Sequence, residues 1–244
     1  MNTPAPPTPP ASSEPVRLLI VDDDPLVRAG LALMLGGGQG IDIVGEGADG
    51  NEAEELVERL RPDVVLMDIR MPVMDGLTAT ERLRRRPDAP EVIVLTTFHA
   101  DEQVLRAIRA GAAGFVLKDT PPARIVDSVR RVAAGDPVLS PAVTRQLMAR
   151  AAGGGHGDRA DRIERARRRF GQLAEREQDV AVAVGRGGSN AEIAASLYLS
   201  VATVKTHVSR ILAKLELNNR VQIALLVHDA GLLDTDDEGG SHLG

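Results

Sequence analysis

Four short apolar runs in this chain each end at polar side chains, and this pattern restricts the fold more than any other feature. The runs Val16–Val21, Val64–Met67, Val92–Leu95 and Phe115–Leu117 lead into Asp22–Asp23–Asp24, Asp68, Thr96–Thr97 and Lys118. Runs this continuously apolar are typical of strands that helices cover on both faces of a parallel sheet. Because the carboxyl ends of parallel strands meet at one edge, we expect these polar side chains to converge on one crevice.

Stretches with helical spacing separate the apolar runs. Pro25–Leu35 is largely apolar and stops at three glycines, and Asn51–Leu60 places apolar residues on one helical face before Pro62. Another strand is expected at Ile41–Val44, and helices are expected around Leu77–Leu83, Val104–Ile108 and Ile125–Val132. Residues 16–135 therefore predict five βα units in a doubly wound α/β domain.

Carboxylates at two of the strand ends favour a site for a divalent cation and a phosphoryl group. Asp22 and Asp23 would repel each other unless a cation such as Mg²⁺ neutralises them, although acidic residues at this place also suit the start of a helix. Asp68 directly follows an apolar strand, where its carboxylate could attack phosphorus and form an acyl phosphate. Thr96 could then donate a hydrogen bond to the phosphate, and Lys118 could neutralise it.

Over Arg17–Gly135 the sequence resembles the receiver domain of two-component response regulators, which has a flavodoxin-like (βα)5 fold. The resemblance is carried by Val21–Asp23, Met67–Gly76, Leu95–Thr97 and Lys118. It implies that Asp68 accepts the phosphoryl group, and that the ligands of Mg²⁺ are Asp22, Asp23, Asp68 and the backbone carbonyl of Arg70. It also implies a switch and phosphate-binding set made of Thr96, Phe115 and Lys118. Asp24 stands where related regulators often have His or Glu, and it adds negative charge beside the site.

The C-terminal part predicts short helices joined by tight turns. They are expected at Glu175–Val184, at Glu192–Leu197, after the cap residue Ser200, and at Arg220–Ala230. In the third helix Val204, Val208, Ile211, Leu212 and Leu215 form an apolar stripe, and Thr206, Ser209, Arg210 and Ala213 lie opposite it. Such a small, polar and basic face fits the second helix of a helix-turn-helix, which enters the major groove of DNA. A three-helix core with a solvated outer face is the alternative.

Over Leu173–Leu233 the sequence resembles the LuxR-type DNA-binding domain of the NarL/FixJ subfamily. Leu173, Glu175–Glu177, Ser189–Asn190, Glu192–Ala194, Thr203–Lys205, His207–Val208, Ile211–Leu212, Lys214–Leu215 and Asn219–Arg220 carry the resemblance. It implies Lys205, Thr206 and Ser209 as base readers, Arg210 and Lys214 as phosphate contacts, and Thr203 and Arg220 as anchors of the DNA backbone or of the fold. Ala174 replaces the usual Thr, which removes a helix cap.

The charge balance of this second domain predicts a dimer. Six basic and six acidic residues balance over Leu173–Leu233, so non-specific affinity for DNA should be weak and sensitive to salt. Binding of a dimer to paired half-sites would compensate. Arg220–Ala230 offers more apolar surface than a small core needs, and we predict Val221 and Leu225 as dimer contacts.

The remaining segments predict tails and a linker. Residues 1–15 and 234–244 are expected to be disordered, and residues 136–172 are expected to link the two domains. Six arginines and three acidic residues alternate over Asp158–Arg169, which favours a solvated helix over a dedicated phosphate clamp. The chain has no cysteine and no signal or membrane segment, so we expect a cytoplasmic location and no membrane partner.

Together these patterns predict a non-enzymatic, DNA-binding response regulator. A histidine kinase would phosphorylate Asp68, and the resulting switch would control dimerisation and binding to double-stranded DNA. Two alternatives remain. The first is a LuxR-type transcription factor that acts independently of phosphate, for which the crowding of Asp24 is the argument. The second is an enzyme that uses an aspartyl-phosphate intermediate.

Overall fold

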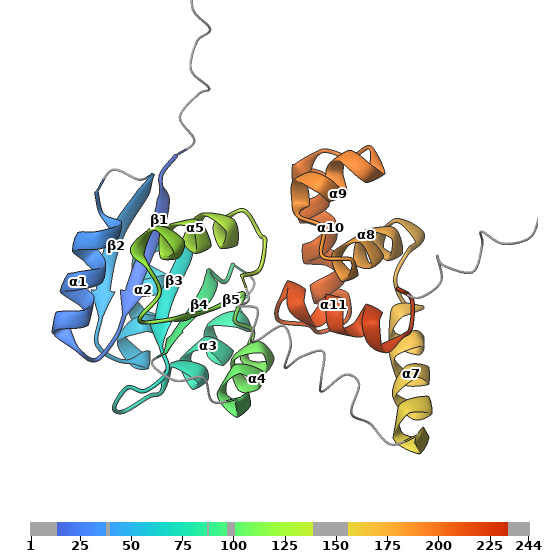
Figure 1. Cartoon of the computed structure of the whole chain (residues 1–244), viewed down its shortest axis with the longest axis horizontal. Helices are drawn as coiled ribbons and strands as arrows, with labels where there is room; N and C mark the ends of the chain where they lie inside the picture. The colour runs from blue at the N-terminus through green and yellow to red at the C-terminus, as the bar shows by residue number, and fades with distance from the viewer. Residues whose placement is uncertain (1–13, 38–39, 87, 97–100, 139–155, 234–244) are drawn as a thin grey trace, which may run out of the picture.

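The computed structural model describes residues 14–37, 40–86, 88–96, 101–138 and 156–233. Its N-terminal domain contains a five-stranded sheet whose neighbouring strands all pair in parallel, in the order β2-β1-β3-β4-β5. The strands are β1 (Val16–Val21), β2 (Ile41–Gly47), β3 (Val64–Asp68), β4 (Glu91–Thr96) and β5 (Gly114–Leu117). The helices that follow them are α1 (Pro25–Leu35), α2 (Gly50–Leu60), α3 (Gly76–Arg84), α4 (Asp101–Ala110) and α5 (Pro122–Ala133) (Figure 1). The predicted doubly wound α/β domain is confirmed.

Two separate apolar clusters cover the faces of this sheet. Because side chains alternate along a strand, Leu18 and Ile20 of β1 face one cluster, and Leu19 and Val21 face the other. The first cluster is completed by α1 and α5, and the second by α2, α3 and α4. All four β1 side chains are fully buried, and each contributes about 1.5–3 kcal/mol relative to an exposed position.

The C-terminal domain is helical and has its own core. Its helices are α7 (His156–Phe170), α8 (Glu175–Gly185), α9 (Asn190–Leu197), α10 (Val201–Lys214) and α11 (Arg220–Asp229). Ser189, Ser200 and Asn219 each accept a hydrogen bond from a backbone N–H of the helix that they precede, as expected of cap residues. Ala174 has no side-chain acceptor, so α8 keeps only half of a capping box, in which Glu177 accepts the N–H of Ala174 at 2.9 Å.

Helix α7 is largely exposed, as predicted for the arginine-rich run, but one side of it also packs on the C-terminal domain. Ala166 is buried in the C-terminal core, and Phe170 packs against it. The Arg167 Nε donates to the carbonyl of Ala230, 2.9 Å away, and Arg169 donates to the carbonyl of Leu215. These carbonyls belong to the residues that end α11 and α10, where a helix has no internal donor left for its last carbonyls. The two arginines therefore complete helix ends of the C-terminal domain.

Several predicted segments fall outside the described residues or differ from the prediction. Thr97, residues 139–155 and residues 234–244 lie outside the described part, as do residues 1–13 of the predicted N-terminal tail. Val138, expected in the linker, forms an isolated bridge with Gly114 and accepts the N–H of Phe115 at 3.0 Å, so the chain after α5 returns to the side of β5. Within the described ranges, no helix is long and apolar enough to cross a membrane.

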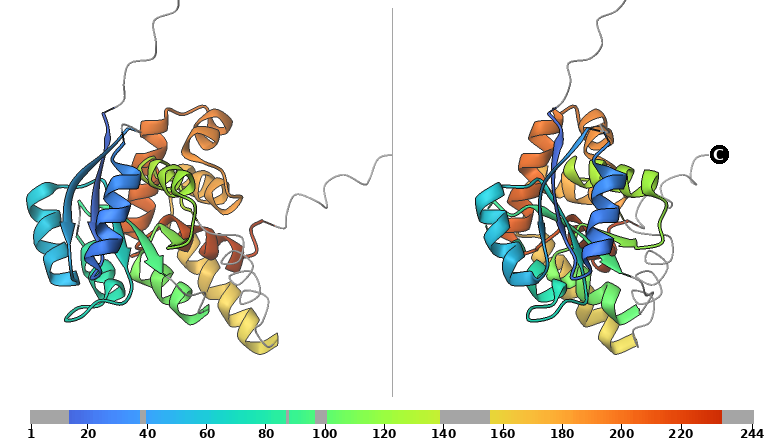
Figure 2. Two further views of the ribbon diagram at one scale, coloured as in Figure 1. Left: turned by 60° about the vertical axis from the view of Figure 1, so that its left-hand side comes forward. Right: turned by 90° about the vertical axis from the view of Figure 1, so that its left-hand side faces the viewer.

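The C-terminal helices lie beyond the β5 edge of the sheet (Figures 1 and 2). Helix α11 contacts α4 of the N-terminal domain and also contacts α7. Its first turn carries the hydrogen bonds to α4, and the carbonyl that follows its last turn accepts from Arg167. The two domains therefore meet at the start of α11.

Candidate functional site

Three carboxylates meet at the carboxyl edge of the sheet, as the strand ends predicted. Asp22 and Asp23 follow β1, and Asp68 ends β3, which pairs with β1. One oxygen from each carboxylate lies within 4.8 Å of the others. Asp22 is fully buried and Asp68 is 6% exposed, whereas Asp23 is open to solvent. The arrangement concentrates negative charge in a partly dry crevice.

Lys118 supplies the compensating charge from the end of β5. Its Nζ lies 2.6 Å from Oδ2 of Asp22 and 3.1 Å from Oδ1 of Asp68. Burial favours the neutral amine, but the hydrogen bond to Asp22 and the charges of both carboxylates outweigh it and raise the pKa of Lys118 above its usual value. Burial raises the pKa of Asp68, Lys118 opposes this, and the charge of Asp22 adds to it. The ammonium therefore lies against two crowded carboxylates and opposes the rise in the pKa of Asp68.

The oxygen atoms of Asp22 suit a cation. Its Oδ1 accepts the backbone N–H of Asp24 at 3.0 Å, which fixes the carboxylate. Its buried Oδ2 has the ammonium of Lys118 as its partner, 2.6 Å away. Hard divalent cations take oxygen ligands of this kind. The three carboxylates thus fit Mg²⁺ as a group.

Asp24 does not point its carboxylate at this site. Its side chain accepts the N–H of Leu26 at 2.8 Å and caps α1, and the residue is exposed. The alternative of a helix cap, which was open for this acidic run, applies to Asp24. Its negative charge stabilises the positive end of a helix instead of crowding the crevice.

The loop after Asp68 is held close by a glycine. A Cβ on Gly76 would lie 1.8 Å from the carbonyl oxygen of Asp68, and the N–H of Gly76 donates to the carbonyl of Ile69 at 3.0 Å. Only glycine permits this approach. Beside the loop lies an open cleft of about 530 Å³, lined by Asp23, Arg70 and Arg106 among others.

The predicted switch residues are both buried. Thr96 ends β4 and is 4% exposed, and Phe115 of β5 is 3% exposed. Phe115 belongs to the same apolar cluster as Ile108 of α4 and Val221 of α11. A movement of Phe115 would therefore act on the contact between α4 and the C-terminal domain.

The predicted DNA-binding residues of α10 are mostly exposed. Solvent reaches Lys205, Thr206, Ser209, Arg210 and Lys214, whereas Thr203 is half-buried. Thr203 takes part in the N-terminal cap of α10, where its N–H donates to the Ser200 hydroxyl at 3.0 Å. Lys214 donates to Oε2 of Glu177 at 2.9 Å, so this lysine also ties α10 to α8.

The N-terminal domain covers part of that exposed face. Lys205 and Ser209 line a cavity of about 190 Å³ whose opposite wall includes Glu91 and Val132. Burial raises the pKa of Glu91, while the charges of Arg84, which forms an ion pair with it at 3.2 Å, and of Lys205 oppose the shift. In this arrangement Lys205 and Ser209 face the receiver domain across this cavity, although both remain exposed to solvent.

Three residues predicted for DNA binding or dimerisation lie at the joint between the domains. Arg220 is 7% exposed and donates to the carbonyls of Gly135 and Gly188, so in this arrangement it does not contact solvent as a phosphate-binding residue would. Val221 is buried in a cluster of the N-terminal domain, and Leu225 packs against it. A dimer through Val221 and Leu225 would require the two domains to separate.

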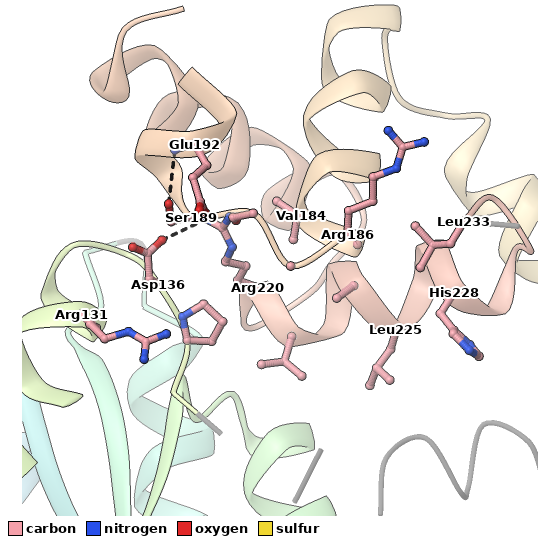
Figure 3. Close-up of a pocket in the computed structure, with 16 residues that line it drawn as sticks. Arg131, Asp136, Val184, Arg186, Ser189, Glu192, Arg220, Leu225, His228 and Leu233 are labelled. Carbon is pink, nitrogen blue, oxygen red and sulfur yellow. Dashed lines mark hydrogen bonds and ion pairs between the residues drawn. The ribbon is translucent and has the colours of Figure 1, made fainter. Parts of the chain in front are cut away.

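A larger cavity, of about 470 Å³, lies beside this joint (Figure 3). Figure 3 shows Asp136 and Arg220 at one end and Leu225 and His228 at the other. The joint was not predicted. Asn190 and Asn219 were named as parts of a family motif, and no local pattern indicates that either side chain contacts the other domain.

Comparisons with known proteins agree with both domains. Residues 18–130 match the response regulator receiver domain, and residues 171–227 match the bacterial regulatory proteins of the luxR family. The transcriptional regulatory protein LiaR of Bacillus subtilis (strain 168) is 36% identical over 213 residues, which cover 87% of this chain and 97% of LiaR. The response regulator protein VraR of Staphylococcus aureus (strain NCTC 8325 / PS 47) is 35% identical over 218 residues, which cover 89% of this chain and 99% of VraR.

Solved structures show the same fold. A two-component response regulator of the LuxR family from Aurantimonas sp. SI85-9A1 is 32% identical, with a TM-score of 0.52, over 56% of this chain and 97% of that chain. The two-component response regulator RcsB in its DNA complex is 22% identical, with a TM-score of 0.50, over 88% of this chain and 98% of that chain, a likeness of fold alone. This chain belongs to the two-component response regulators that join a receiver domain to a LuxR-type DNA-binding domain and act as transcription regulators.

Proposed function

We propose that phosphorylation of Asp68 by a histidine kinase controls whether this regulator can bind DNA. The observation that carries the proposal is the grouping of Asp22, Asp23 and Asp68 within 4.8 Å, with the ammonium of Lys118 against two of them. The site can receive a phosphoryl group because a cation and a lysine can share its charge. A cytoplasmic location, where kinase and DNA are both accessible, is part of the proposal.

The reaction is a transfer between two side chains. A carboxylate oxygen of Asp68 attacks the phosphorus of a phosphohistidine, the P–N bond breaks, and the histidine leaves with the electron pair and takes up a proton. The product is an acyl phosphate on Asp68. Lys118 then lies where it can pair with the new phosphoryl oxygens, and Thr96 can donate its hydroxyl hydrogen to one of them.

Asp22, Asp23, Asp68 and the backbone carbonyl of Arg70 are the residues that would hold Mg²⁺. A divalent cation supplies positive charge that offsets both the carboxylates and the phosphoryl oxygens. The backbone N–H of Asp24 donates to Oδ1 of Asp22 and so holds this carboxylate in place for that role.

Thr96 and Phe115 transmit the effect of the new charge on Asp68 to the joint between the domains. Thr96 turns toward the phosphoryl group, Phe115 adjusts to the space that is vacated, and the shared cluster of Phe115, Ile108 and Val221 loosens. The released α10 then reads bases with Lys205, Thr206 and Ser209.

In the released state, Arg210 and Lys214 contact DNA phosphates, and Thr203 anchors the start of α10. Arg220 becomes available as a further anchor, and Val221 and Leu225 contact a second copy. The homodimer makes up for the balanced charge of the DNA-binding domain by binding two half-sites at once.

The phosphate-independent alternative loses its support. It depended on Asp24 crowding the acidic site, and the carboxylate of Asp24 caps α1 instead. The enzyme alternative also loses support, because the relatives LiaR and VraR are regulators over nearly their whole length.

Labelling with acetyl phosphate tests the assignment. With Mg²⁺ present, the wild-type protein should acquire one acid-stable, hydroxylamine-sensitive phosphate, and Asp68→Asn should acquire none, because an amide cannot act as the nucleophile. Asp127→Asn is the matched control, since Asp127 is exposed on α5, and it should be labelled like the wild type. A label that persists in Asp68→Asn would contradict the proposal.

A further inference from the structure

The two receiver helices that border the DNA-binding domain end in the same way. Helix α4 is followed by Gly111 with φ +106°, and α5 is followed by Ala134 and then Gly135 with φ +89°. In each case the chain turns through a left-handed glycine, and the last carbonyls of the helix need donors from elsewhere. Both helices obtain such donors from an asparagine of the DNA-binding domain.

Asn219 serves the end of α4, and Asn190 serves the end of α5. The Nδ2 of Asn219 donates to the carbonyls of Ile108 at 2.9 Å and Ala112 at 2.8 Å. The Nδ2 of Asn190 donates to the carbonyl of Ala134 at 2.8 Å. Asn219 is 1% exposed and Asn190 is 3% exposed, so both contacts are shielded from water.

The glycines make room for this approach. A Cβ on Gly135 would lie 2.7 Å from Nδ2 of Asn190, and a Cβ on Gly111 would lie 2.9 Å from Cβ of Asn218, the neighbour of Asn219. These distances are shorter than real side chains allow. The receiver surface therefore leaves room for Asn190 at Gly135, and at Gly111 it leaves room for Arg84 and for Asn218, the residue before Asn219.

Each asparagine uses its oxygen inside its own domain. Oδ1 of Asn219 accepts the N–H of Gln222 at 2.9 Å and so caps α11, and Oδ1 of Asn190 accepts from Arg220. The nitrogen is thus left to point across the joint. Asn219 thus links the start of α11 to the end of α4, and Asn190 links the start of α9 to the end of α5. We call these two side chains the asparagine clasp.

Neighbouring contacts reinforce the clasp. Gln222 donates to the carbonyl of Ile108 at 2.9 Å, and Arg84 of α3 donates to the carbonyl of Asn218 at 2.8 Å. The N–H of Asn190 donates to Asp136 at 3.0 Å. All of these bonds cross between the domains, and Asn190 also lines the cavity in which Lys205 and Ser209 face the receiver domain.

We propose that the asparagine clasp is the latch that keeps the base-reading face of α10 closed in the unphosphorylated protein. The inference rests on the proposed function and names the contacts through which it is regulated. The asparagine clasp bonds to the ends of α4 and α5, the helices that precede and follow β5 in the chain. Phe115 of β5 shares an apolar cluster with Ile108 and Val221. A shift of α4 removes the acceptors of Asn219 and opens the joint.

Aspartate in place of asparagine isolates this contact. Asn219→Asp keeps an oxygen for the N–H of Gln222, and aspartate is as good a helix cap as asparagine, but an oxygen now faces the carbonyls of Ile108 and Ala112. Asn190→Asp makes the same change at α5. Asn51→Asp is the matched control, because Asn51 is exposed on α2, away from the joint. Asn219→Ser is a second variant that keeps a cap and adds no charge.

Domain separation is measured first, in the full chain without phosphate. The chain has no cysteine, so Glu55→Cys and Ala195→Cys introduce two exposed labelling sites, one in each domain, for distance measurement between spin labels. We expect a single short distance for the wild type and for Asn51→Asp, and a broad, longer distribution for the clasp variants. An unchanged distance in folded Asn219→Asp and Asn219→Ser would overturn the proposal.

DNA binding is measured second, with duplexes selected from a random pool by the phosphorylated wild-type protein. Without phosphorylation, the clasp variants should bind these duplexes about tenfold more tightly than the wild type. The loss of these few hydrogen bonds shifts the equilibrium from the closed state to the open state by about that factor. The added negative charge would act in the opposite direction. An opened joint with unchanged affinity would overturn the clasp as a latch. Failure of the proposed function would show in the wild type itself, as affinity that phosphorylation does not change.

Discussion

The acidic crevice of the receiver domain and the exposed face of α10 serve the same signal but are assembled in different ways. The crevice is made by topology, because parallel strands deliver Asp22, Asp68 and Lys118 to one sheet edge and burial forces them into contact. The face of α10 is made of side chains that its own domain leaves exposed, and the neighbouring domain decides whether they are accessible. The buried site is thus fixed by contacts within one domain, whereas access to the recognition surface depends on the position of the other domain.

Replacing Lys118 should have the largest effect. The substitution tests whether the crevice depends on the lysine to balance the charge of its carboxylates. Lys118→Met leaves the buried Asp22 and Asp68 unpaired, and we expect the free energy of unfolding of the receiver domain to fall by about 3 kcal/mol without Mg²⁺. Added Mg²⁺ should recover part of the loss. Urea unfolding with and without Mg²⁺ measures both.

Arg59→Met is the control for that experiment, because Arg59 is an exposed cation on α2. It should change the free energy of unfolding by no more than about 0.5 kcal/mol. Equal stability of Lys118→Met and the wild type in the absence of Mg²⁺ would show that the crevice is not held together by this charge.

Substitutions on α10 should have an intermediate effect and should depend on the DNA sequence. Ser209→Ala should cost about 1–3 kcal/mol of discrimination at one base position, because a base contact is lost. Arg210→Ala should weaken binding to all sequences alike and lower the salt dependence by about one counterion. Arg210 is the better phosphate probe, since Lys214 is bound to Glu177 and its loss would also affect the fold. Parallel losses across sequences for both variants would remove Ser209 from the base readers.

Acid should produce the smallest effect, at the bond between α8 and α10. The backbone N–H of Ala174 and then the ammonium of Lys214 hold the pKa of Glu177 below its usual value of 4.5. A carboxylate with a lowered pKa stabilises the fold above its unfolded pKa and loses this contribution as the pH falls through the folded value. Glu177→Gln should therefore flatten the acid dependence of unfolding of the DNA-binding domain below about pH 4.5, by about 1 kcal/mol. Identical acid profiles for the variant and the wild type would disprove this role.

The two sites also differ in how well the sequence predicts them. Helix α1 spans Pro25–Leu35 as its apolar pattern predicts, and the acidic cluster forms as the strand ends predict. Both depend on local periodicity and on the geometry of one sheet. Ser200 likewise caps α10 as expected. What lies within one domain could be inferred from the order of apolar and polar residues.

Contacts between separately folded surfaces could not be inferred in this way. Arg220 was predicted to anchor DNA or the fold, yet its nearest partners are carbonyls at the joint and Asn190. Asn219 has the sequence signature of a helix cap, and nothing nearby in the chain shows that its nitrogen bonds to residues more than one hundred positions earlier. Such bonds depend on how two finished domains dock, which no periodic pattern encodes.

Helix α7 changes where the output module begins. A fragment that starts at Leu173 would discard Arg167 and Arg169 and expose the carbonyls of Ala230 and Leu215 that they serve. The output module of this regulator therefore includes α7, which starts at His156. Exchange of output modules between regulators, in the laboratory or in evolution, would have to carry this helix along for the transplanted module to retain its helix ends.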